Sequence, residues 1–347
     1  MRALLAGVAA LSMLAAACGG PAPGSEGSFR ASLDGGGSSF QDALQQGVKA
    51  AFAKAEPGIT VNYTKSGSGQ GKRDLADQTI DYAGTDSPVK AEEKEGFKGG
   101  ELLYFPVAAS PITLTANVAG ISSLRLDATL IAGIFEGHIT RWNDPGIRAL
   151  NGSQRLPSTT IVPVHRSDRS GTTANFTRYL SVAAPEVWSR GSGDEVRWGT
   201  PTAAEKNSGV ASLVSTTDGA IGYIDLVDAV AVRELVPTLT IAEVRNNSGN
   251  FVQPKLPGAT AALESSALAP DLTFDSIDAP GEAAYPLTAP TWVLTYAHYD
   301  DSTTAEALRR FLTFFLTDGQ ELAGVTGYAR LPPAMADRAL AQVDRIT

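Results

Sequence analysis

The sequence has 347 residues, of which 43% are hydrophobic, and its net charge is −9 at pH 7. This acidic balance argues against nucleic acid as a partner and against binding through an anionic membrane surface. It does not argue against a small anionic ligand, because local dipoles set such a site. The length suits a globular body of two domains rather than one.

The chain begins with an apolar segment that is typical of export. Arg2 precedes an apolar run that ends at Cys18, and this run is too short for a stable membrane span. Cys18 is the only cysteine, and the small residues before it resemble a bacterial lipobox. We therefore expect residues 1–18 to be a lipoprotein signal peptide with lipid on Cys18. The alternative is ordinary cleavage after Ala17, which leaves a free thiol. Residues 19–28, rich in Gly, Pro and Ser, are expected to form a flexible tether.

Short apolar runs rich in β-formers alternate with helical patterns along the remaining chain, which predicts an α/β fold. One helix is expected over 40–55, where large apolar residues recur every four positions, and another over 305–316. Residues 246–282 lack a clear period and are expected to be irregular. Strands are predicted at 59–63, 102–107, 112–116, 161–165, 221–224 and 291–296.

Three small-residue turns that carry hydroxyl groups come directly before helical patterns, at 35–40, 66–71 and 166–173. A helix N-terminus has unpaired N–H groups and a partial positive charge, so it attracts an anion. Serine and threonine hydroxyls add donors that carry no charge. Each turn alone is better explained as ordinary helix capping. Three of them in one chain favour convergence on one anionic ligand.

Two ionisable residues near these turns sharpen this hypothesis. Arg166 can offer a full positive charge and a planar fork of donors to an oxyanion, and Asp168 can orient that fork. The alternative for this pair is a surface ion pair in a loop. Asp86 follows an apparent strand and precedes Pro88, where an ordinary Asx turn is the alternative.

Six segments, in this order and spacing, resemble the phosphate-binding protein of the bacterial high-affinity phosphate ABC transporter. The resemblance extends over most of the chain, from Leu33 to Leu340. The segments are GGGSSF (35–40), SGSGQG (66–71), DYAGTDSPV (81–89), IFEGHITRWNDPGIRALN (134–151), HRSDRSGTTANFTRYL (165–180) and GAIGYID (219–225).

The resemblance implies which residues contact phosphate. Two departures from the family pattern are Ser39, where threonine is common, and Arg169, where glycine is common. If the Arg169 side chain pointed inward it would alter affinity, whereas we expect it to point outward. The implied contacts are Ser39, Phe40 (through its backbone N–H), Ser68, Asp86, Arg166, Ser170, Gly171 and Thr172.

The resemblance also implies a two-lobe periplasmic binding protein fold of type II, with the ligand in the cleft between lobes that close by a hinge motion. Lobe I is expected to be discontinuous, over 29–108 and 285–347, and lobe II to cover 109–284. The implied partners are inorganic phosphate, the permease subunits of an ABC importer with their cytoplasmic ATPase, and the membrane through the N-terminal lipid. We expect an extracytoplasmic monomer without a cofactor or metal.

Other functions are alternatives. The three histidines, His138, His165 and His298, lack metal-ligand spacing, and no G-x-S-x-G or Walker motif occurs, which disfavours an exported phosphatase. A carrier of sulfate, molybdate or tungstate is the nearest alternative. Asp86 discriminates here, because phosphate has a proton to donate to a carboxylate and sulfate has none. An adhesion or scaffolding role is a third possibility.

Overall fold

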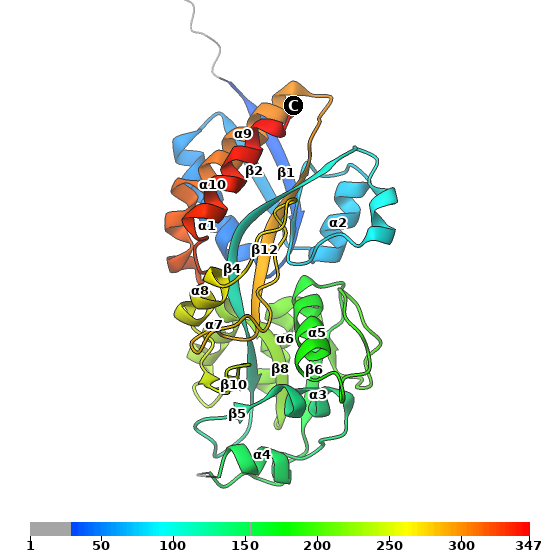
Figure 1. The fold of residues 1–347 in the computed structure, drawn as a ribbon, viewed down its shortest axis with the longest axis vertical. Coiled ribbons are helices and arrows are strands. Elements are labelled where there is room, and N and C mark those ends of the chain that lie inside the picture. The colour runs from blue at the N-terminus through cyan, green and yellow to red at the C-terminus, as the bar shows by residue number, and fades with distance from the viewer. Residues whose placement is uncertain (1–28, 153) are drawn as a thin grey trace, which may run out of the picture.

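The computed structural model describes residues 29–152 and 154–347, so the predicted signal peptide, Cys18 and the tether lie outside the described residues. The described chain forms an elongated molecule with two α/β lobes, which lie one above the other in Figure 1. Lobe I holds parallel strands β1 (Ala31–Gly37), β2 (Ile59–Thr64) and β3 (Tyr82–Thr85) with helices α1 (Asp42–Ala55), α2 (Ser68–Ala76), α9 (Ser302–Leu316) and α10 (Pro333–Gln342).

Lobe II contains the middle of the chain. Its strands are β5 (Arg125–Leu126), β6 (Val162–Arg166), β7 (Ala203–Ala204), β8 (Ala220–Asp225), β9 (Thr240–Ile241), β10 (Glu243–Arg245) and β11 (Phe251–Val252). Strands β6 and β8 are parallel, and a small separate sheet has the order β11-β10-β5. The helices are α3 (Ala128–Glu136), α4 (Pro145–Leu150), α5 (Gly171–Ala183), α6 (Lys206–Thr216), α7 (Leu226–Leu235) and α8 (Leu256–Glu264).

Two antiparallel strands, β4 (Leu102–Ala116) and β12 (Thr288–Tyr296), connect the lobes side by side (Figure 1). β12 pairs with β3 of lobe I, whereas the far end of β4 pairs with β8 and β9 of lobe II. One sheet therefore runs from lobe to lobe in the order β2-β1-β3-β12-β4-β8-β6-β7. The predicted lobe boundaries at 108/109 and 284/285 fall within β4 and just before β12, and they stay a prediction.

The structure corrects three local predictions. The two strands expected at 102–107 and 112–116 are the single strand β4, because β12 pairs with β4 from Leu102 to Pro111 and so continues across the gap. The segment expected to be irregular contains β11 and the helix α8, whose small apolar residues bury one face. The first helix begins at Asp42 rather than at Phe40, which lies in the preceding turn.

The predicted apolar face of α1 forms part of the lobe I core. Leu44, Val48 and Phe52 are buried, and the Phe52 ring meets Phe311 of α9 edge to face at a centroid distance of 5.3 Å. Full burial of one such side chain stabilises a fold by about 1.5–3 kcal/mol. This packing fixes the start of α1 beside the end of β1, where the first predicted turn lies. Within the described ranges, no helix is both long and apolar enough to cross a bilayer.

Candidate functional site

The second and third predicted turns meet where the lobes face each other. The Gly69 N–H in the first turn of α2 donates to the carbonyl of Arg169, just before α5, at 3.1 Å. A methyl group on Gly171 would lie 2.5 Å from Ser68 Oγ and 2.7 Å from Asp86 Cβ, which is closer than atoms approach. The two lobes are therefore closed on each other, and glycine is required at position 171.

On the lobe I side, Asp86 accepts hydrogen bonds from three hydroxyl groups. Ser38 Oγ donates to both carboxylate oxygens at 2.6 and 2.7 Å, Ser68 Oγ donates at 3.0 Å, and Thr291 Oγ1 donates at 2.6 Å. The Gln41 side chain donates to Thr291 Oγ1, which directs the Thr291 hydrogen toward Asp86. A carboxylate offers about four acceptor positions. Ser38 has a single hydroxyl proton, which its two contacts share, so the three hydroxyl groups supply three protons to four acceptor positions. One position can therefore accept a further donor, and the Asp86 carboxylate does not form an Asx turn.

The environment of Asp86 shifts its ionisation. The residue is only 2% exposed, and burial raises the pKa of its carboxyl to about 6. The hydroxyl donors and the charge of Arg166 act in the opposite direction without cancelling the effect of burial. Above this pH, Asp86 is a buried carboxylate that can accept a hydrogen bond but cannot donate one.

On the lobe II side, Arg166 ends β6 and is 3% exposed. Its Nε and Nη2 donate to the two carboxylate oxygens of Asp168 at 2.7 and 2.5 Å, which is the predicted pairing. The Arg166 Nη1 donates at 3.4 Å to Thr172 Oγ1. Burial acts to raise the pKa of Asp168, but the hydrogen bonds and charge of Arg166 outweigh it, and the pKa is lowered. Asp168 thus stays ionised and holds the arginine fork by one edge.

Helix α5 directs its N-terminus at the same point. Ser170 is its N-cap, and the Ser170 hydroxyl accepts from the Thr173 N–H at 3.2 Å. The next amide in the helix, that of Ala174, bonds to the Ser170 carbonyl. The helix itself offers no acceptor to the N–H groups of Gly171 and Thr172. Those two amides, next to Arg166, form a positive edge that suits an anion.

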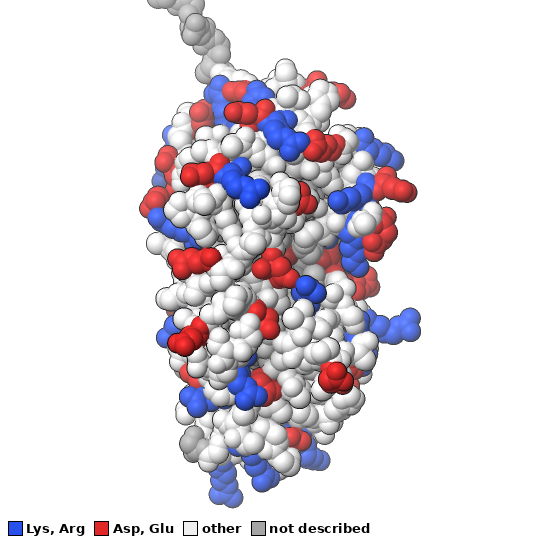
Figure 2. All heavy atoms as spheres, viewed as in Figure 1, with Lys and Arg blue, Asp and Glu red and all other residues white. Residues whose placement is uncertain are grey.

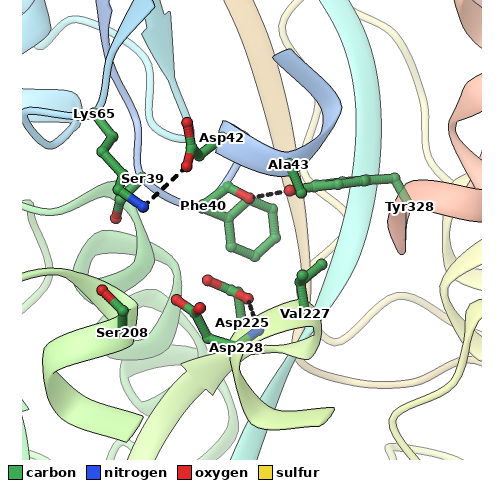
Figure 3. Close-up of a pocket in the computed structure, with 10 residues that line it drawn as sticks. All are labelled: Ser39, Phe40, Asp42, Ala43, Lys65, Ser208, Asp225, Val227, Asp228 and Tyr328. Atoms are coloured by element: carbon green, nitrogen blue, oxygen red, sulfur yellow. Dashed lines mark hydrogen bonds and ion pairs between the residues drawn. The ribbon is translucent and has the colours of Figure 1, made fainter. Parts of the chain in front are cut away.

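Ser39 and Phe40 lie at the border of this region rather than at its centre. They line a cavity of about 90 Å³ that also holds Asp225 and Asp228 at the start of α7 (Figure 3). Burial raises the pKa of Asp225, and the neighbouring Asp228 raises it further. The Phe40 ring is buried edge to face against Tyr328, whose hydroxyl donates to the Phe40 carbonyl. The predicted Phe40 contact is therefore feasible through the backbone N–H only.

Two ion pairs also join the lobes beside this site. Lys72 of α2 meets Asp194 of lobe II at 2.7 Å, with both side chains 6% exposed, and Ser87 Oγ donates to the same carboxylate at 2.5 Å. Arg169 pairs with Glu93 at 2.8 Å at the partly exposed rim. The Arg169 guanidinium therefore bonds to Glu93 at the rim, which is consistent with the outward orientation expected from the sequence.

Sequence reasoning missed three residues of this region. Ser38 rather than its neighbour Ser39 bonds Asp86, and the motif GGGSSF does not tell the two apart. Thr291 comes from β12, more than two hundred positions beyond Asp86, so no local motif could find it. Asn207, in the first turn of α6, is fully buried and contacts Ser39 and Thr172. No hydroxyl-rich turn directly precedes α6, so the search for such turns before helices did not single out this helix.

The described residues contain no group of three or more His, Cys, Asp or Glu side chains that could hold a metal ion. His165 is buried, and its ring stacks on Trp198 at a centroid distance of 4.7 Å. Figure 2 shows acidic and basic side chains interspersed over one face of the molecule. On this face the two signs of charge are mixed, so it presents no large patch of a single sign.

Comparisons with known proteins find relatives of this chain over most of its length. Residues 24–319 match the family model described as a PBP superfamily domain. The chain is similar to Phosphate-binding protein PstS 3 of Mycobacterium leprae, with 36% identity over 83% of this chain and 79% of the relative. It is 32% identical to Phosphate-binding protein PstS 2 of Mycobacterium tuberculosis, over 98% of both chains. Among solved structures, a phosphate binding protein from Stenotrophomonas maltophilia matches with a TM-score of 0.71 and 23% identity, over 90% of this chain and 93% of that one.

Proposed function

The chain belongs to the PstS phosphate-binding proteins of the PBP superfamily, and we propose that it captures inorganic phosphate outside the cytoplasmic membrane. The proposed ligand contacts are Ser39, the Phe40 N–H, Ser68, Asp86, Arg166, Ser170, Gly171 and Thr172. Lobe I then contributes the carboxylate and hydroxyls, and lobe II contributes the full positive charge and the N-terminus of α5.

The observation that carries this proposal is the position of Asp86 opposite Arg166. A buried carboxylate in an anion site repels an anion unless the anion brings a proton. Phosphate near neutral pH always has at least one O–H, which can donate to the acceptor position left on Asp86. Sulfate has none, so one of its oxygens would lie against a carboxylate oxygen. Sites that require a ligand O–H reject an analogue without it by about 10⁴–10⁵.

We further propose that phosphate capture is coupled to closure of the lobes and is followed by delivery to the permease subunits of an ABC importer, which its cytoplasmic ATPase drives. The names of the relatives support a phosphate ligand. The strands β4 and β12, which connect the lobes, are the expected hinge. The protein is proposed to act as a monomer without a cofactor.

A calorimetric titration of the whole mature protein with phosphate, arsenate and sulfate at pH 8 tests the ligand. We expect tight binding of phosphate, binding of arsenate because it is also protonated, and essentially no binding of sulfate. Comparable affinities for sulfate and phosphate would refute both the ligand and the role of Asp86. Tight binding of molybdate or tungstate in preference to phosphate would favour the nearest alternative.

The proposed lipid on Cys18 has a separate test, because that residue lies outside the described part of the chain. Replacement Cys18→Ala should release the protein from the membrane fraction or block its processing. Mass spectrometry of the wild-type protein should find lipid on the new N-terminus. Recovery of all wild-type protein as a soluble, unlipidated form would contradict this part of the proposal.

A further inference from the structure

Asn207 has a fully buried side chain that finds only weak hydrogen-bond partners among the residues around it. Its Nδ2 donates to Thr172 Oγ1 at 3.3 Å and to Ser39 Oγ at 3.5 Å. Both distances exceed the usual range of about 2.7–3.2 Å for such bonds. Its Oδ1 is buried and has no hydrogen-bond partner within the described residues. An amide with two long bonds and an unpaired oxygen stabilises a fold poorly, because buried polar groups without partners cost about 1–3 kcal/mol.

The place of Asn207 is determined by the same carboxylate that orients Arg166. Asp168 Oδ1 accepts from Arg166 Nε at 2.7 Å and also from the backbone N–H of Lys206 at 3.0 Å. Lys206 has a φ of 62°, a left-handed conformation that is unfavourable for a lysine and persists only where its surroundings impose it. The hydrogen bond to Asp168, rather than the backbone preference of Lys206, therefore fixes the first turn of α6 beside Arg166.

The two hydroxyls that Asn207 contacts come from opposite lobes. Ser39 lies in the turn between β1 and α1 of lobe I, and Thr172 lies in the first turn of α5 in lobe II. Figure 3 shows Ser39 on one side of the cavity and Ser208, the residue after Asn207, across from it. Asn207 thus lies between the predicted ligand contacts of lobe I and those of lobe II. Its two long bonds go to hydroxyls that are themselves predicted to donate to phosphate.

We propose that Asn207 is a further phosphate-contacting residue, whose side-chain amide donates a hydrogen bond to an oxygen of the anion held between Ser39 and Thr172. This inference rests on the proposed function, because it uses the same ligand. The amide is a neutral donor, so it adds a directed contact without changing the charge of the site. It also gives α6 a direct part in closure, since the anion then links α6 of lobe II to the turn before α1 of lobe I.

The test compares Asn207→Asp with Asn207→Ala by calorimetric titration with inorganic phosphate at pH 8. Aspartate keeps the shape of asparagine and can accept hydrogen bonds from both hydroxyls, so a purely structural cross-link would survive this change. A donor to the anion would be replaced by a repelling carboxylate. We expect Asn207→Ala to weaken phosphate binding about tenfold, the equivalent of about 1.4 kcal/mol. Asn207→Asp should weaken it more than Asn207→Ala does.

The control is Ser212→Asp, which adds the same charge to an exposed position of α6 and should leave the affinity unchanged. Melting temperatures without phosphate report whether each variant is folded, and the isosteric Asn207→Asp carries the decision if the alanine variant is unstable. Wild-type affinity in Asn207→Asp would overturn this inference and leave the proposed function intact. Failure of the wild-type protein to bind phosphate would overturn both.

Discussion

Two carboxylates flank Arg166, one from each lobe, and their surroundings shift them in opposite directions. Asp168 of lobe II bonds with both oxygens to the arginine fork, and its pKa is lowered. Asp86 of lobe I is bonded by neutral hydroxyls in a more buried position, and its pKa is raised to about 6. The comparison shows that one residue type can have two tasks. A carboxylate with an ionic partner orients that partner, whereas a carboxylate bonded by hydroxyl groups is the one that we propose accepts a hydrogen bond from a protonated ligand.

The largest expected effect on phosphate affinity comes from removing Arg166 on the lobe II side. Arg166→Ala removes the proposed charged partner of the anion, which is buried, and should cost about 2–5 kcal/mol, or roughly 30-fold to 5,000-fold in phosphate affinity. Arg166→Lys should rescue only part of this loss, because an ammonium group cannot keep the fork on Asp168 and also reach the anion. The matched control is Arg178→Ala, which removes an exposed arginine of the same α5 helix. Titration calorimetry that finds Arg166→Ala within about threefold of wild type would remove Arg166 from the site.

The second expected effect concerns Asp86 on the lobe I side and the change of sulfate affinity with pH. Burial raises the pKa of Asp86, so closure favours the protonated acid, and that contribution is lost as the pH rises through about 6. Protonated Asp86 can donate to a sulfate oxygen, and sulfate itself does not titrate in this range. Sulfate binding should therefore strengthen roughly 50-fold between pH 8 and pH 6, following the protonated fraction of Asp86. The control is Asp86→Asn, in which this pH dependence should vanish. If the sulfate affinity of the wild type did not change between pH 8 and pH 6, ionised Asp86 would not be the group that excludes sulfate.

The third expected effect concerns closure rather than the anion. Lys72→Met leaves Asp194 buried without its cation in the closed state, and opening of the lobes relieves this cost. We expect a loss of about tenfold in phosphate affinity, or about 1.4 kcal/mol. The double variant Lys72→Met/Asp194→Asn should recover part of the loss, because it no longer buries an unpaired charge. An unchanged affinity in Lys72→Met would show that this pair does not hold the lobes together.

The smallest expected effect comes from the other ion pair between the lobes. Arg169 and Glu93 are about one-third exposed, and exposed pairs of this kind contribute about 0.2–1 kcal/mol. Arg169→Ala should therefore change phosphate affinity by less than about fivefold, with a larger effect at low salt. A loss as large as that of Arg166→Ala would mean that Arg169 reaches the anion in solution.

The α/β class, the Arg166–Asp168 pair and the Ser170 turn that starts α5 could be predicted because they depend on local patterns. Hydroxyl-bearing turns before helices, and Arg166 two positions before Asp168, are visible in the sequence, and the family resemblance supplied the two-lobe fold. The partners of Asp86 could not be predicted in full, since Thr291 reaches it only through the pairing of β12 with β3. Asn207 was missed because its place depends on a backbone contact to Asp168 rather than on a motif. The single strand β4 was missed because no element was predicted for residues 108–111, and only the pairing with β12 shows that the strand continues through them.

The most direct test of the central claim is the ratio of phosphate to sulfate affinity at pH 8, measured by titration calorimetry in the wild-type protein and in Asp86→Asn. If Asp86 accepts a hydrogen bond from the protonated ligand, the wild type should bind phosphate about 10⁴-fold or more tightly than sulfate. Asp86→Asn, whose amide can donate to a sulfate oxygen, should narrow that ratio sharply, chiefly through stronger sulfate binding. An equal ratio in the two proteins would contradict the account.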